Sequence, residues 1–128
     1  MKQKKTPIGR TLTTHDNFLG KKQKSNKRRP LAVLEVNKRN ELAVVPLSSR
    51  QGKHRTKLKE YQDGKSYFKH FVEIEDDEGR PIKVGKKFKE NHPKHDISRR
   101  DMQKIRDKVL RHSAPALENR KKIEKFRK

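Results

Sequence analysis

The sequence contains no cysteine and no tryptophan, and aromatic residues make up only 5% of its 128 residues. Without cysteine, neither a disulfide framework nor a thiolate metal site can form. No apolar run reaches the roughly 20 residues of a membrane-spanning helix, and no apolar stretch follows the basic N-terminus as in a secretory signal. A glycine-rich phosphate loop and a Cys/His finger are also missing. We therefore expect a cytoplasmic protein with no membrane partner and no cofactor.

Acidic and apolar residues are scarce as well. The chain carries 37 lysines and arginines against 16 aspartates and glutamates, a formal net charge of +21, and only 27% of its residues are hydrophobic. Such a charge attracts polyanions, and lysine and arginine bind nucleic acid by displacing counterions from its phosphates. An anionic membrane surface is the competing partner, but no basic amphipathic helix carries an apolar face that would insert into lipid. RNA is the favoured partner, with DNA as the alternative.

The length fits one domain over residues 1–128. Apolar residues are unevenly spread, which divides the chain into three parts. Residues 1–27 are expected to form a basic, flexible N-terminal arm with an extended patch near residues 8–14. Residues 28–112 form the core. Residues 113–128 are a basic tail, either a second short helix or a frayed end.

Two short apolar runs, residues 31–36 and 42–47, flank a polar turn at residues 37–40. This pattern predicts a β-hairpin, and its unbroken apolar character indicates strands buried on both faces at the centre of a sheet. The polar residues 48–64 are predicted to be a loop. Residues 67–88 predict a second hairpin around an acidic turn, which we interpret as a solvated turn rather than a cation site.

A helix is predicted to begin after Ser98, which can cap it, with Asp101 reaching back to complete a capping box. Met102, Ile105 and Val109 recur at helical spacing and give this helix one apolar face. The order of strands followed by a helix predicts an α+β fold that is mainly β. We expect a small bent antiparallel sheet or an SH3-like partial barrel with a C-terminal helix.

Basic and hydroxyl residues flank the predicted central hairpin. Lys27, Arg28 and Arg29 lead into its first strand, and Ser48 and Ser49 end its second strand. Antiparallel pairing brings these ends to the same edge of the sheet, where a guanidinium fork can bind two phosphate oxygens. The alternative is a solvated basic loop beside serines that only terminate a strand.

Residues 29–34 (RPLAVL) and 44–49 (VVPLSS) resemble the core of the MazF/PemK (Kid-like) toxins and of the ToxN group that shares their barrel. The resemblance implies a metal-independent endoribonuclease in which the RNA 2′-OH attacks its own phosphate. It further implies that Arg29 stabilises the phosphorane, that Ser48 and Ser49 bind phosphate oxygens, and that Arg50 or Lys53 adds positive charge. It also implies an antitoxin partner, protein or RNA, and a possible homodimer.

Six histidines are candidates for acid or base catalysis near neutral pH. His54, six residues beyond Ser48 in the basic segment, is the preferred catalytic candidate, and His70 on a predicted strand is the other. Each has the alternative interpretation of a surface histidine, and His92 with His95 does not predict a zinc site. The residues predicted to bind nucleic acid are Lys27, Arg28, Arg50, Lys53, Arg55, Lys57 and, by stacking, Tyr67.

Three functions remain open from the sequence. The first is an endoribonuclease toxin, supported by the paired motifs and the charge. The second is a non-catalytic RNA- or DNA-binding protein, supported by the charge and by the scarcity of acid–base pairs. The third is an interaction module whose basic surface meets an acidic protein.

Overall fold

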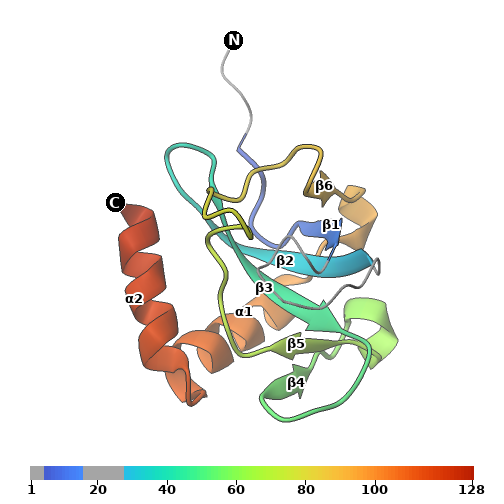
Figure 1. Cartoon of the computed structure of the whole chain (residues 1–128). Coiled ribbons are helices and arrows are strands. Elements are labelled where there is room, and N and C mark those ends of the chain that lie inside the picture. The colour runs from blue at the N-terminus through green and yellow to red at the C-terminus, as the bar shows by residue number, and fades with distance from the viewer. Residues whose placement is uncertain (1–4, 16–27) are drawn as a thin grey trace.

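A computed structural model describes residues 5–15 and 28–128. Within these residues there are six β-strands, two α-helices and three short helical turns (Figure 1). The strands are β1 Thr11–His15, β2 Arg28–Val36, β3 Leu42–Ser48, β4 Arg55–Lys57, β5 Tyr67–Lys69 and β6 Lys89–Glu90. The helical elements are η2 Tyr61–Gly64, η3 Pro93–His95, α1 Arg99–Asp107, the π-helical turn η4 Lys108–His112, and α2 Ala116–Arg127.

The strands form one antiparallel sheet in the order β4-β5-β3-β2-β1-β6. The hairpin of β2 and β3 lies at its centre, as predicted. The two outer strands, β4 and β6, do not pair with each other, so the sheet is open rather than closed into a barrel. The predicted α+β class, a small antiparallel sheet with a C-terminal helix, is confirmed.

The central hairpin is buried on both faces because its residues alternate between two cores. Leu31 and Val44 belong to one core, which is closed by Ile82 and Phe88 from the chain between β5 and β6. That segment passes over the sheet face seen in Figure 1. Asn40 adopts a left-handed φ of 58° in the turn of the hairpin, a conformation that asparagine tolerates well. The predicted polar turn is therefore confirmed.

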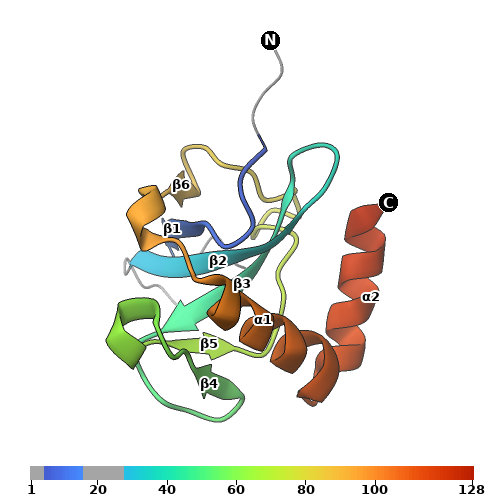
Figure 2. The same cartoon turned by 180° about the vertical axis from the view of Figure 1, so that it is seen from behind.

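The helices cover the opposite face, where α1 crosses the sheet in Figure 2. Met102 and Ile105 of α1 and Ile123 and Phe126 of α2 pack against this side of the sheet. The predicted tail is thus a helix that contributes to the core. None of the helices within the described residues is long and apolar enough to cross a membrane.

Glu35 holds the two helices to the sheet. Its carboxylate accepts hydrogen bonds from Arg127 and, at 3.2 Å, from Arg106. Burial alone would raise the pKa of Glu35, but the two guanidinium groups outweigh burial and lower it. This charged contact fixes the C-terminal helix beside the central hairpin.

Three segments differ in part from the prediction. The extended patch predicted near residues 8–14 overlaps β1, but β1 belongs to the folded sheet rather than to a flexible arm, with Leu12 fully buried between β2 and β6. Residues 48–64, predicted to be a loop, contain β4 and η2. The predicted second hairpin is present only in part: the acidic turn at residues 76–79 forms and Glu75 pairs with Pro81 across it, but β5 is the only strand of the described residues between 67 and 88.

Candidate nucleic-acid interface

The starting end of β2 and the final end of β3 lie at the same edge of the sheet. Leu31 pairs with Pro46, so continuing this register by two residues places Arg29 opposite Ser48. The sequence-based prediction that the two motifs converge is therefore confirmed. β5 continues the sheet beyond Ser48, whose register partner on that side is Tyr67.

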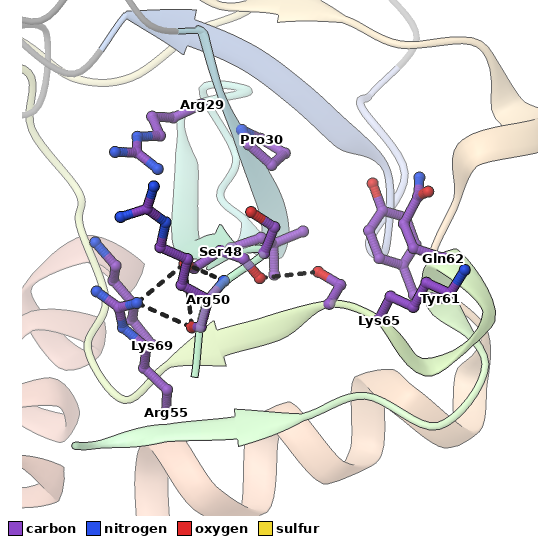
Figure 3. A pocket seen from close by; sticks show the side chains of 12 residues that line it. Arg29, Pro30, Ser48, Arg50, Arg55, Tyr61, Gln62, Lys65 and Lys69 are labelled. Atoms are coloured by element: carbon purple, nitrogen blue, oxygen red, sulfur yellow. Dashed lines mark hydrogen bonds between the residues drawn. The ribbon is translucent and has the colours of Figure 1, made fainter. Parts of the chain in front are cut away.

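A pocket of about 750 Å³ opens where these strand ends meet η2 and the loop after β3. Figure 3 shows the charged ends of Arg29, Arg50, Arg55 and Lys69 gathered to one side of Ser48. Lys65 is the fifth cation, and none of the lining residues in the described part of the chain is acidic. We call this the basic pocket. Its lining residues are Arg29, Pro30, Leu47, Ser48, Ser49, Arg50, Arg55, Tyr61, Gln62, Lys65, Ser66 and Lys69.

The hydroxyl of Ser48 is already engaged by the protein. The residue is buried, and its Oγ accepts hydrogen bonds from Arg55 Nη1 and from the Arg50 backbone N–H, both at 3.1 Å. Ser48 therefore shapes the turn after β3 and positions Arg55. Ser49, to which the resemblance also assigns phosphate binding, is exposed and lines the same pocket.

Arg55 is held in place from β4. Besides Ser48, its Nη1 donates to the backbone oxygen of Arg50 at 2.9 Å. Its side chain also lies close over Gly52, where an added Cβ would stand 3.4 Å from Cδ and Nε. Among the described residues, the hydrogen bonds of this guanidinium all use Nη1. Since a guanidinium has five N–H donors, Nε and Nη2 can still bind a ligand.

η2 forms another wall of the basic pocket, and a buried carboxylate holds it. Asp101 of α1 is fully buried and accepts backbone N–H bonds from Lys59, Glu60 and Tyr61, each at 2.9 Å. Burial would raise the pKa of Asp101, but these donors lower it below its usual value. Ser98 caps the helix as predicted, accepting from the Asp101 N–H at 3.2 Å. The reciprocal bond of the predicted capping box is replaced by this contact with η2.

The backbone of η2 is strained. Gln62 and Asp63 both have left-handed φ values, 53° and 54°, although neither is glycine. Two adjacent residues in this conformation are costly, by roughly 1–2 kcal/mol each, and such outliers concentrate at functional sites. Gln62, one of the two strained residues, lines the basic pocket together with Tyr61.

A second cavity, of about 570 Å³, adjoins the basic pocket and shares Arg55 and Lys69 with it. His70 Nε2 lies 2.6 Å from Thr56 Oγ1, and the His54 ring meets the His70 ring edge-on at 6.3 Å between centroids. Burial, followed by the positive charges of His54 and Lys108, lowers the pKa of His70. We call this the histidine pocket. Its lining residues are Lys53, His54, Arg55, Lys69, His70, Phe71, Ala114 and Pro115.

The predicted site residues thus separate into groups. Arg29, Ser48, Ser49, Arg50 and Arg55 come together in the basic pocket, whereas Lys53 and His54 line the histidine pocket. The predicted residues Lys57 and Tyr67 line neither of these pockets. Lys27 lies outside the described residues, as does the side chain of Arg28.

Sequence reasoning missed several lining residues, namely Tyr61, Gln62, Lys65, Ser66 and Lys69. Lys69 could have been predicted from strand geometry. It lies two residues from Tyr67 on a predicted strand and therefore on the same face of the sheet. The residues of η2 could not be placed in this way, because their polar sequence predicts a loop, which does not fix the direction of side chains.

No family model, no curated protein and no solved structure matches this chain. The resemblance of residues 29–34 and 44–49 to the MazF/PemK and ToxN toxins therefore stays a prediction.

Proposed function

We propose that this protein binds RNA through backbone phosphates held in the basic pocket. The observation that carries the proposal is the composition of the pocket wall, in which the described residues include five cations and no acid. Arginine forks bind phosphate oxygens in pairs. Arg55 is fixed by Ser48 and by the Arg50 carbonyl, so little side-chain entropy is lost when it binds a phosphate. The choice of RNA over DNA rests on the resemblance of residues 29–34 and 44–49.

The alternative to a localised site is diffuse attraction by a chain with a net charge of +21. Two double variants that remove the same charge separate these cases. Arg50→Gln with Lys69→Gln alters the basic pocket, and Lys121→Gln with Lys125→Gln alters exposed positions on α2. Figures 1 and 2 both place α2 on the opposite side of the molecule from η2.

Affinity for a single-stranded 2′-O-methyl RNA, which a 2′-OH nuclease cannot cut, is measured for both pairs by fluorescence anisotropy. The pocket pair is expected to lose about tenfold or more in affinity, with a salt slope lower by about 1.4, or 0.7 for each lost phosphate contact. The affinity of the α2 pair for this RNA is expected to stay within about threefold of that of the parent protein. Equal losses in both pairs would contradict a localised site.

A second candidate function is metal-independent cleavage of the bound strand, and the histidine pocket favours it. In this reaction the 2′-oxygen attacks the adjacent phosphorus while a base takes its proton. The bond to the 5′-oxygen breaks, an acid protonates that oxygen, and a 2′,3′-cyclic phosphate remains. The lowered pKa of His70 keeps an imidazole neutral near pH 7, as a base must be. His54 next to it is the candidate acid, and Arg55 and Lys69 stabilise the phosphorane charge.

Incubating the protein with natural single-stranded RNA in EDTA tests this second function. Cleavage is expected to leave 2′,3′-cyclic phosphate ends and to fall at least a hundredfold in His70→Gln, a much larger change than any loss of affinity for the 2′-O-methyl strand. Intact RNA after prolonged incubation would restrict the protein to binding alone. Cleavage that survives in a His54→Gln, His70→Gln double variant would place the acid and base elsewhere.

A further inference from the structure

The histidine pocket differs chemically from the basic pocket beside it. Phe71, Ala114 and Pro115 supply apolar walls, and the His54 and His70 rings supply flat, polar-edged surfaces. Apolar and aromatic walls with a few fixed polar groups are typical of sites for small planar ligands. Apolar walls do not stabilise a bound phosphate, so we expect this pocket to bind an apolar, planar part of a ligand.

The two pockets form one continuous site because Arg55 and Lys69 line both. Their register partnership across β4 and β5 places them side by side on the sheet. A phosphate bound by this pair has the cationic cavity on one side and the aromatic cavity on the other. A nucleotide has its groups in the same order, because its charged phosphate lies next to a flat, largely apolar base.

One buried amide makes the walls of the histidine pocket rigid. Asn119 is 1% exposed, and its Nδ2 donates to the backbone oxygens of His70 at 2.9 Å and Val109 at 2.7 Å. Its Oδ1 accepts from the Val72 N–H at 3.1 Å. The amide thereby ties the segment directly after β5, which carries His70 and Phe71, to the helices on either side of Ala114 and Pro115. A cavity with walls fixed in advance binds a ligand at a lower entropic cost.

We propose that the histidine pocket is a subsite for one unpaired nucleobase, adjoining a phosphate held by Arg55 and Lys69. This proposal rests on the proposed binding of RNA in the basic pocket and adds its substrate class. The base stacks on Phe71, as bases of single strands stack on aromatic side chains, and the two imidazoles, which meet edge-on, line the cavity beside it. A base inside a duplex has both faces covered by its neighbours and cannot enter. The preferred ligand is therefore a single strand or a looped-out nucleotide.

The test compares two strands of equal length and charge. One is a 2′-O-methyl oligouridylate, and the other is the same backbone with stable abasic spacers in place of the bases. The strand with bases is expected to bind about tenfold tighter, the order of one stacked base. In Phe71→Leu, which keeps an apolar side chain but loses the flat ring, this advantage is expected to vanish while abasic binding is unchanged. Leu117→Ala, an exposed apolar position on α2, is the matched control and keeps the advantage.

The outcomes separate the subsite from the phosphate site. Equal affinity for both strands overturns the base subsite and leaves phosphate binding standing. Failure of both strands to bind at low salt overturns the proposed function itself. A base advantage that survives Phe71→Leu places the base elsewhere and also overturns the subsite.

A measurement on the unmodified protein covers the case in which Phe71→Leu does not fold. The imidazole C–H signals of His54 and His70 in an NMR spectrum are followed during titration with each strand. The proposal expects shifts of both rings with the oligouridylate that the abasic strand does not reproduce. Identical shifts with both strands overturn it.

Discussion

Arg55 and Ser48 lie on non-adjacent strands of the sheet, and Arg55 Nη1 donates a 3.1 Å hydrogen bond to Ser48 Oγ across the end of β5. The same hydroxyl accepts the backbone N–H of Arg50. One buried serine therefore sets both the turn after β3 and the direction of the guanidinium. The hydroxyl to which the resemblance assigns phosphate binding is, in this structure, the support of the Arg55 guanidinium.

Ser48→Ala is expected to release Arg55 and loosen the turn. Loss of the shared acceptor should lower the free energy of unfolding by about 1 kcal/mol and weaken RNA binding several-fold, because the guanidinium loses its fixed orientation. Denaturant unfolding and anisotropy titrations measure the two effects. Ser48→Thr retains the hydroxyl and should stay close to the parent protein in affinity. Unchanged affinity in Ser48→Ala would show that the orientation of Arg55 is irrelevant to binding.

Asp101→Asn is expected to destabilise the protein through η2. The amide has one acceptor oxygen where the carboxylate has two for three backbone N–H donors, so the loss should be about 2–3 kcal/mol in the free energy of unfolding. Asp107→Asn on the same helix removes a surface ion pair to Arg111 at 3.6 Å. That control should cost less than about 1 kcal/mol. Similar losses in the two variants would mean that the contact with η2 contributes little.

Glycine substitutions at the two strained residues of η2 should affect protein stability and RNA affinity differently. Gln62→Gly relieves a left-handed φ and is expected to raise the free energy of unfolding by up to about 1 kcal/mol, while it weakens RNA binding because a side chain leaves the pocket wall. Asp63→Gly relieves the same strain at a residue that does not line the basic pocket. It should stabilise the protein without loss of affinity. Thermal unfolding with parallel binding titrations distinguishes the pair, and a matched loss of affinity in both would contradict a role for the Gln62 side chain.

Acidification should destabilise the folded protein through His70. Burial, with His54 and Lys108 nearby, lowers the folded-state pKa of His70 below its unfolded value of about 6.5. The unfolded chain therefore takes up a proton first as the pH falls, so stability is lost from about pH 6.5 downward until the folded pKa is passed. Melting temperatures of His70→Gln should vary less over this window. His112→Gln, at an exposed histidine, is the control and should follow the parent profile.

The parts of the fold that the sequence predicts are those specified by neighbouring residues. The central hairpin follows from two apolar runs and a turn that accommodates a left-handed Asn40, and α1 follows from the Ser98 cap and its apolar stripe. The extended conformation near residues 8–14 is predicted, but the place of β1 in the sheet is not, because Leu12 is its one large apolar residue and its stability comes from pairing with β2 and β6. Propensity alone does not encode such pairing.

In the candidate site, too, some features follow from neighbouring residues and others depend on distant ones. The convergence of Arg29 with Ser48 follows from hairpin register, which the sequence specifies. The wall formed by Tyr61 and Gln62 depends on Asp101, some 40 residues away in the chain, whose carboxylate binds the backbone of Lys59, Glu60 and Tyr61. Backbone N–H groups are present at every such residue, so nothing in the sequence marks these three as the partners of one carboxylate.

Lysine footprinting tests the localised phosphate site most directly. The unmodified protein is acetylated briefly with and without a saturating single-stranded 2′-O-methyl RNA, and modification is measured at each lysine by mass spectrometry. Lys65 and Lys69 in the basic pocket should be protected several-fold by the RNA, while Lys121 and Lys125 on α2 should react at nearly unchanged rates. Equal protection of all four, or protection on α2 alone, would contradict RNA binding in the basic pocket.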